Sequence, residues 1–117
     1  MSNVFVDVER NKNGLTPRPA RLPSEECIHR DVAADQAAAF SHERGHPVFP
    51  VKLPGECVSM SIGELAPGAA TSNHRHAYES LVYVLEGRGH TVLEGQRFDF
   101  KAGDAFYTPP WCWHQHV

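Results

Sequence analysis

Two histidines separated by a single residue, His74 and His76, lie in an extended run that follows the Pro67-Gly68 turn. In a strand, successive side chains point to opposite faces, so residues two apart share a face with their Cα atoms about 6.5–7 Å apart. Two imidazoles placed in this way can reach one metal ion. Arg75 faces the other side and is no ligand, because its guanidinium stays protonated and offers only donors. The pair alone also fits a polar strand surface that happens to carry two histidines.

A third histidine follows near the C-terminus, after a Gly-Asp turn and a short apolar strand. Together the two stretches resemble the cupin family. The family's first motif is matched by Gly68, His74, His76 and Gly87, and its second by Gly103, Pro109 and His114. The resemblance covers residues 68–117. It implies a jelly-roll β-barrel in which His74, His76 and His114 hold a divalent transition metal.

One departure from the family pattern reduces the set of metal ligands that we expect. The family's glutamate falls at Ser80, and Glu79 lies one position away. Because a one-residue offset in a strand puts a side chain on the opposite face, we expect three histidine ligands, with Glu79 as an alternative added ligand.

Cupins without the glutamate include gentisate, salicylate and diketone-cleaving dioxygenases and thiol dioxygenases. The segment 108–116 resembles the Thr-Pro-x-Trp-x-Trp-His-x-His segment of the gentisate-type enzymes. Those enzymes usually carry an arginine two places after the Ser80 position, where this chain has Val82. The cation expected to bind an aromatic carboxylate is therefore missing at that position.

Further site residues follow from their positions beside these motifs. We expect the substrate pocket to be lined by Ser80, Val82, Trp111, Cys112 and Trp113, and a proton to be moved by Tyr78, Glu79 or His116. Cys112 and His116 share the parity of His114, which points both into the barrel. For Cys112 and the two tryptophans, plain core packing is the alternative. We expect His42, His46 and His90 to take no part in metal binding.

Three neutral imidazoles suit Fe(II), Mn(II), Ni(II), Cu(II) or Zn(II), and the histidines alone do not choose among them. The resemblance implies a non-heme Fe(II) dioxygenase that acts on a small aromatic or enolisable substrate able to chelate the metal. Two alternatives stay open. One is a non-oxidative metallocupin, an isomerase or lyase, and the other is a small-molecule-binding cupin without turnover.

The chain of 117 residues has the length of one domain. From about residue 47, short strands alternate with Gly and Pro turns, so with the resemblance we expect an all-β, single-domain jelly roll. A helix is predicted over residues 31–44, capped by Asp31 and ended by Gly45. Residues 1–30 combine an alternating stretch with several prolines and are predicted to form an extended arm. Residues 31–117 are then the barrel domain.

The net charge is −3 and no run of Lys or Arg forms a basic face, so nucleic acid is not expected as a partner. No signal peptide or membrane span is apparent, which favours the cytoplasm. Three cysteines without metal-type spacing indicate reduced thiols. Barrels of the family usually continue for a strand beyond the third histidine. Either the chain is cut short after Val117, or an N-terminal strand covers that edge, and we expect a homodimer.

Overall fold

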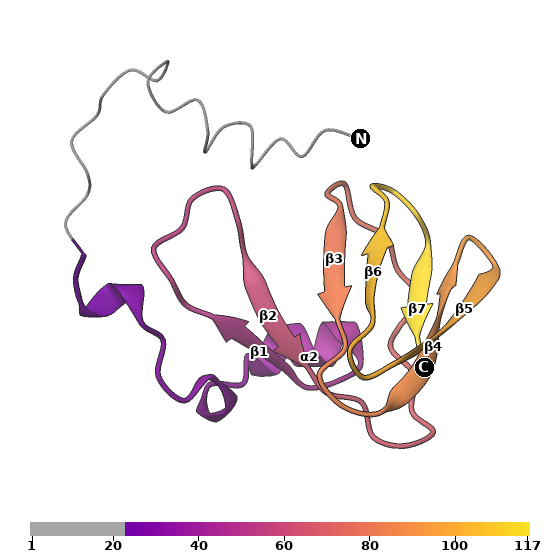
Figure 1. Cartoon of the computed structure of the whole chain (residues 1–117), viewed down its shortest axis with the longest axis horizontal. Coiled ribbons are helices and arrows are strands. Elements are labelled where there is room, and N and C mark those ends of the chain that lie inside the picture. The colour runs from indigo at the N-terminus through magenta and orange to yellow at the C-terminus, as the bar shows by residue number, and fades with distance from the viewer. Residues whose placement is uncertain (1–22) are drawn as a thin grey trace, which may run out of the picture.

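The structure, a computed structural model, describes residues 23–117, so most of the predicted N-terminal arm lies outside the described residues. The described chain is mostly β with one short α-helix (Figure 1). Its helical elements are the 3₁₀ turns η2 (Glu25–Cys27) and η3 (Val32–Ala34) and the α-helix α2 (Ala38–Arg44). Its strands are β1 (Val48–Val51), β2 (Met60–Gly63), β3 (Ser80–Tyr83), β4 (Arg88–Leu93), β5 (Gln96–Lys101), β6 (Ala105–Thr108) and β7 (His114–His116).

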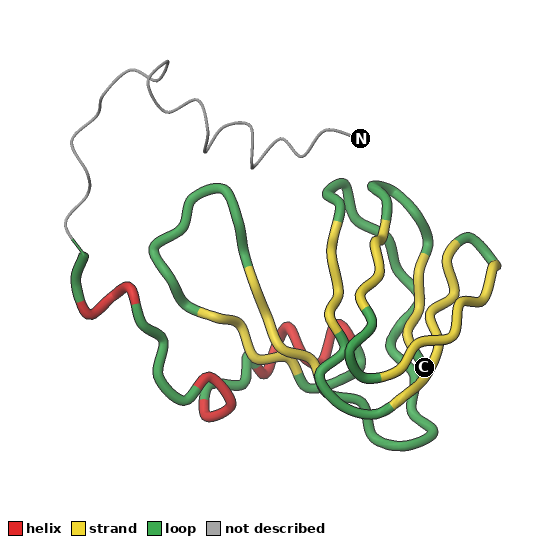
Figure 2. Tube along the Cα trace, in the orientation of Figure 1, coloured by secondary structure: helices red, strands yellow, loops and turns green. Residues whose placement is uncertain are grey.

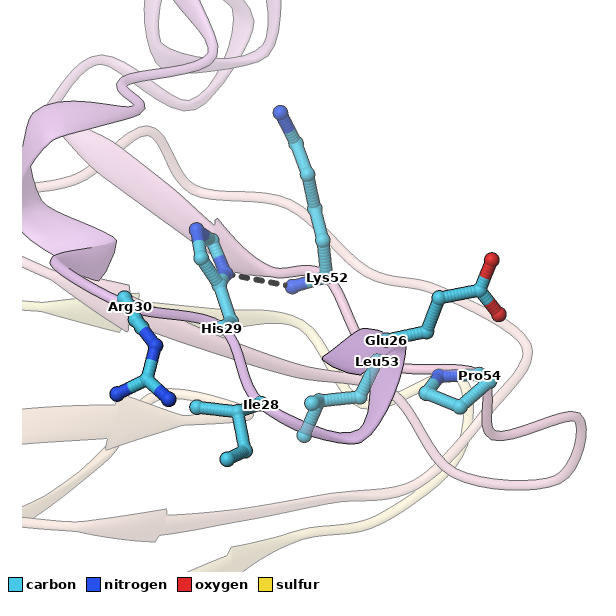
Figure 3. A pocket seen from close by; sticks show the side chains of 7 residues that line it. All are labelled: Glu26, Ile28, His29, Arg30, Lys52, Leu53 and Pro54. Atoms are coloured by element: carbon cyan, nitrogen blue, oxygen red, sulfur yellow. Dashed lines mark hydrogen bonds between the residues drawn. The ribbon is translucent and has the colours of Figure 1, made fainter. Parts of the chain in front are cut away.

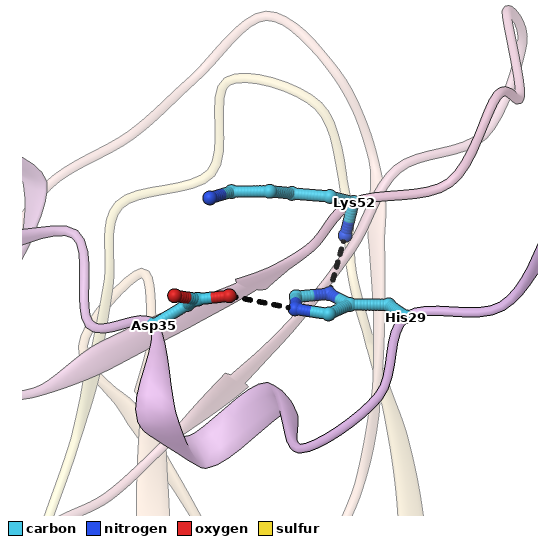
Figure 4. Close-up of polar contacts among 3 residues, drawn as sticks. All are labelled: His29, Asp35 and Lys52. Carbon is cyan, nitrogen blue, oxygen red and sulfur yellow. Dashed lines mark hydrogen bonds and ion pairs between the residues drawn. The ribbon is translucent and has the colours of Figure 1, made fainter. Parts of the chain in front are cut away.

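The α-helix is shorter than the predicted span 31–44, because it begins at Ala38. Asp31 takes a left-handed conformation with φ 51° and makes no capping bond, and only a 3₁₀ turn follows it. Asp35 is held by His29, whose Nε2 lies 3.0 Å from Oδ2 of Asp35, while its Nδ1 accepts the N–H of Lys52 (Figure 4). These bonds tie the segment to the end of β1 and compete with helix formation. The helix ends at Gly45 as predicted, with φ 77°.

The strands form three antiparallel sheets: β1 with β2, β3 with β6, and β5-β4-β7. β4 and β5 form a hairpin, in which Leu93 faces Gln96 across the turn. In the three-stranded sheet β7 pairs with β4, so that His116 lies opposite Thr91. Residues 64–79 join β2 to β3 almost without regular structure, as Figure 2 shows by colour.

The segment that carries His74 and His76 runs along the free edge of β7. His74 and His114 exchange both backbone hydrogen bonds, at 3.1 and 2.9 Å. The N–H of Thr71 donates to the carbonyl of His116 at 2.9 Å, and the N–H of Trp111 donates to the carbonyl of His76 at 2.7 Å. Bonds on both sides of the His74–His114 pair therefore hold the two motifs in register.

The buried apolar side chains of the described residues are few: Val48, Phe49, Val84 and Cys112. The outer face of β3 and β6 instead exposes large apolar side chains, with Leu81 82% exposed and Tyr83 and Tyr107 beside it. The homodimer expected from the sequence stays a prediction, for which an exposed apolar face of this kind is a candidate contact surface. Within residues 23–117, no helix is long and apolar enough to cross a membrane.

Thr71 and Thr108 provide a matched test of the contacts that hold the histidine segment. Both side chains are buried, but Thr71 Oγ1 accepts the N–H of His116 at 2.9 Å, whereas Thr108 Oγ1 has no partner within the described chain. Thr71→Val leaves a buried donor unsatisfied, so we expect unfolding free energy to fall by about 1–3 kcal/mol. Thr108→Val is expected to be neutral or stabilising. Urea unfolding of both variants checks this, and equal losses would contradict the assigned role of Thr71.

Candidate metal centre

The structure brings His74, His76 and His114 together. Their potential ligand atoms all lie within 4.8 Å of one another, and they form the one group of three or more potential ligands found among residues 23–117. Metal–imidazole bonds are about 2.0–2.1 Å long, so two nitrogens on one ion are at most about 4.2 Å apart. The spacing of the three nitrogens exceeds this limit by no more than about 0.6 Å.

The backbone determines which nitrogen of each ring faces the ion. The Nδ1 atoms of His74, His76 and His114 lie 2.9, 2.7 and 2.9 Å from the carbonyl oxygens of Ser72, Tyr78 and Cys112. A carbonyl only accepts, so each Nδ1 carries the proton and each Nε2 keeps its lone pair. Metal-binding histidines in proteins are commonly oriented by such a bond from the second nitrogen. These bonds therefore orient the three rings so that each presents Nε2 to a metal.

Burial also favours the neutral rings. The pKa of His74 and that of His114 are lowered from the usual value, above all because the charged ring would lose its water. The positive charge of Arg44 contributes to the lowering at both residues. Protons should consequently compete less with a metal here than at an exposed histidine.

His116 lies next to this group but is not part of it. Its ring centroid is 5.7 Å from that of His114 and 5.4 Å from that of Phe106. Thr91 Oγ1 donates to the Gln115 carbonyl, so it accepts from Nδ1 of His116 at 3.0 Å. Burial lowers the pKa of His116 to about 4. His116 therefore faces the interior as expected, as a ring that stays neutral at neutral pH and can accept a hydrogen bond at Nε2.

Glu79 and Tyr78, which were expected to move a proton at the site, are not placed to do so in the structure. Glu79 is exposed, and its Oε2 accepts from the Tyr107 hydroxyl at 2.5 Å, a bond that raises the pKa of Tyr107. Glu79 is thus turned away from the histidines, as its offset from Ser80 predicted, and is neither a ligand nor a group in contact with the site. Tyr78 stacks on the His76 ring with centroids 3.9 Å apart, so it supports a ligand.

The two tryptophans differ from the pocket walls expected from the sequence. Trp111 and Trp113 are largely exposed, and Arg75 lies over both rings, 4.7 and 4.8 Å from their centroids. Trp113 alternates with His114, so it shares the face of Arg75 on the opposite side from the ligands. These three residues form an outer cluster that cannot wall a pocket around the metal.

The remaining predicted residues lie on the inner side. Ser80 and Val82 are half-buried on β3, opposite Thr108 and Phe106 of β6. Cys112 is buried, and its carbonyl accepts the His114 Nδ1–H, which gives this residue a positioning role through its backbone. His42 is exposed, and His46 and His90 are half-buried outside the ligand group.

Two surface hollows of the described chain lie away from the three histidines. One is lined by Glu26, Ile28, His29, Arg30, Lys52, Leu53 and Pro54, and Figure 3 shows their side chains spread along the chain before β1 and after it. The other is lined by Asn73, Val92, Glu94, Gly95, Trp113 and Gln115. Neither hollow contains a group of metal-ligand residues. The histidine site is instead defined by the short distances between its three side chains.

Comparisons with known proteins agree with this geometry. Residues 61–117 match the family model described as "Cupin domain". A gentisate 1,2-dioxygenase of Aquipseudomonas alcaligenes is 41% identical over 54 residues, which cover 45% of this chain and 16% of that protein. A gentisate 1,2-dioxygenase of Haloferax is 29% identical over 99 residues, 80% of this chain and 28% of that protein.

Among solved structures, a cupin 2 conserved barrel domain protein from Salinispora arenicola is similar, with a TM-score of 0.53 and 25% identity over 87% of this chain and 78% of that one. The all-β fold, the short helix and this neighbour confirm the expected jelly-roll class, and the three-histidine group defines a metal site of cupin type. The family match identifies residues 61–117 as a cupin domain. It spans less than a third of the length of the curated dioxygenases named above.

Removal of a ligand should abolish stoichiometric metal binding. We expect the protein to bind one divalent metal ion per chain, and His74→Ala or His114→Ala to reduce bound metal to a small fraction of one equivalent. His42→Ala and His90→Ala serve as controls outside the group and should keep the wild-type content. Atomic emission measurements after gel filtration test this, and equal metal in all four variants would refute the site.

The metal-free protein should lose stability in acid partly through His116. Its pKa is about 4 in the folded chain against 6.5 as the ordinary value, so the folded state binds fewer protons than the unfolded state between these values. His116 therefore contributes to the free energy of unfolding above pH 6.5. This contribution, up to about 3 kcal/mol, is lost as the pH falls toward 4.

Urea unfolding at a series of pH values in the presence of a chelator measures this loss. His116→Gln removes the titrating ring, so its stability should fall less steeply between pH 6.5 and pH 4 than that of the wild type. His90→Gln is the matched control and should keep the wild-type slope. Identical slopes for His116→Gln and the wild type would show that His116 is not held neutral.

Proposed function

We propose that this cupin is a non-heme iron dioxygenase that acts on a small aromatic or enolisable substrate. The observation that carries the proposal is the ligand group itself: three imidazoles with no carboxylate among them. Relatives named gentisate 1,2-dioxygenase and 5-aminosalicylate 1,2-dioxygenase are 41% and 36% identical to this chain over 54 and 53 residues, which supports oxidative chemistry over other cupin activities.

His74, His76 and His114 would hold the iron through Nε2, because each Nδ1 is bonded to a backbone carbonyl. Bound Fe(II) supplies the redox chemistry with O₂ and accepts oxygen atoms of a chelating substrate. Three neutral ligands leave the charge of the ion uncompensated. This favours a substrate that binds as an enolate or phenolate.

The protein's own residues would orient the substrate. Ser80 and Val82 are on the inner face of β3 and offer a small, weakly polar wall. Val82 provides no charge, so a carboxylate is not recognised at that position. His116 has a free Nε2, because its Nδ1–H is used by Thr91, and its pKa of about 4 keeps it neutral, so it would offer a substrate hydroxyl a hydrogen-bond acceptor rather than a strong base.

Oxygen uptake tests this proposal. Iron-loaded protein, prepared without air, is given hydroxyaryl acids, diketones and thiols in an oxygen electrode, with metal-free protein as the background. We expect uptake with a hydroxyaryl acid or an enolisable diketone. Ser80→Glu adds a carboxylate on the inner face, so it should bring uptake close to the background while metal content stays unchanged.

Ser61→Glu introduces the same charge on an exposed position of β2 and should leave the uptake at the wild-type level. Product formed without oxygen would replace the dioxygenase by a non-oxidative metallocupin. No product with any substrate class would indicate a binding protein. Normal turnover in Ser80→Glu would show that the inner face of β3 is not part of the site.

A further inference from the structure

The geometry points to Arg44, the last residue of α2, as the anion-binding group of the metal site. The substrate class that follows is a chelating compound with a carboxylate, whose anionic group pairs with Arg44 while its other oxygens face the metal. This inference rests on the proposed function for the chelating part of the substrate. It adds a recognition group that lies outside both histidine motifs.

The last turn of α2 lies directly against the ligand segment. The backbone carbonyl of Arg44 accepts hydrogen bonds from both the N–H and the hydroxyl of Ser72, each at 3.1 Å. The carbonyl of Ser72 in turn accepts the Nδ1–H of His74 at 2.9 Å. Arg44 is thus connected to a metal ligand through a single intervening residue, and its backbone position does not depend on its side chain.

The Arg44 side chain is a half-buried cation that lacks an anionic partner. Its guanidinium carbon lies 4.7 Å from the centre of the Phe40 ring, and its Nε is buried without a hydrogen bond. Among residues 23–117 no carboxylate forms an ion pair with it. A buried donor of this kind costs free energy unless a partner satisfies it, and a ligand oxygen is a suitable partner.

The charge of Arg44 acts on the histidine group. After the larger effect of burial, it contributes to the lowered pKa of His74 and of His114, which places it in the same surroundings as these rings. A divalent ion on three neutral imidazoles adds further positive charge, and Glu79 is engaged by Tyr107 on the outer face. The site therefore combines two positive centres, and guanidinium binds a planar carboxylate in a two-point geometry.

Arg75 provides a natural contrast. It lies between two ligands in the sequence, but its guanidinium is stacked on Trp111 and Trp113 on the outer face. Its charge is not among those that shift the pKa of His74 or of His114. The two arginines thus lie on opposite sides of the ligand segment. Substitution of Arg75 is therefore the matched control for substitution of Arg44.

The experiment compares three diols that share a chelating head. Catechol has no carboxylate, whereas 2,3-dihydroxybenzoate and 3,4-dihydroxybenzoate carry it at two positions. Calorimetric titration uses the full chain loaded with Ni(II), without oxygen, so binding is measured apart from turnover. We expect at least one acid to bind about tenfold tighter than catechol, as one charge-assisted pair would provide.

Arg44→Gln should abolish this preference and leave the affinity for catechol unchanged, and Arg75→Gln should keep it. Arg44→Lys retains the charge without the planar fork and should show an intermediate preference. Circular dichroism and nickel content confirm that each variant is folded and loaded. If one Arg44 variant does not fold, the other decides the comparison.

Three results would overturn the inference. Equal binding of catechol and the acids to the wild type would leave a chelating site without an anion group. An unchanged preference in Arg44→Gln, or an equal loss for catechol and the acids, would remove Arg44 from recognition. If no diol binds the wild type, the chelating site of the proposed function fails along with the inference, which distinguishes that failure from the first two.

Discussion

The metal site depends on one backbone pairing, the two hydrogen bonds exchanged by His74 and His114. This pairing brings together two motifs that are distant in the sequence. Once His74 lies opposite His114, alternation places His76 on the same side and turns Arg75 to the other. The flanking bonds of Thr71 and Trp111 keep the register, since a shift of one residue would turn the ligands to the outer face.

The same backbone also prepares the rings chemically. Three carbonyls hold the three Nδ1 protons, so the lone pairs of all three Nε2 atoms remain available. This arrangement costs no extra side chains, and it explains how a small domain with few buried apolar residues can present a preorganised ligand set. The charge that such a ligand set leaves uncompensated is the physical basis for expecting an anionic substrate.

Local patterns in the sequence were sufficient to predict short strands from about residue 47 onward and the end of the helix at Gly45, because these follow from alternation and turn residues. The three ligands could be predicted because the spacing of the histidines in the two motifs shows which side chains lie on the same face of a strand. The predicted start of the helix at residue 31 was wrong, because His29 binds Asp35 through a contact that no local sequence pattern encodes. The outward tryptophans and the position of Arg44 likewise depend on tertiary contacts, with Arg75 and Ser72 respectively.

The central claim is that three neutral imidazoles and no carboxylate of this chain hold the metal. X-ray absorption spectroscopy of the cobalt-loaded protein tests it most directly, because imidazole rings give a distinctive outer-shell scattering pattern. The account predicts three imidazoles per ion at about 2.1 Å, with the remaining ligands being oxygen from solvent. It also predicts the loss of one imidazole in His76→Ala. A spectrum with fewer than three imidazoles, or with a sulfur ligand from cysteine, would contradict it.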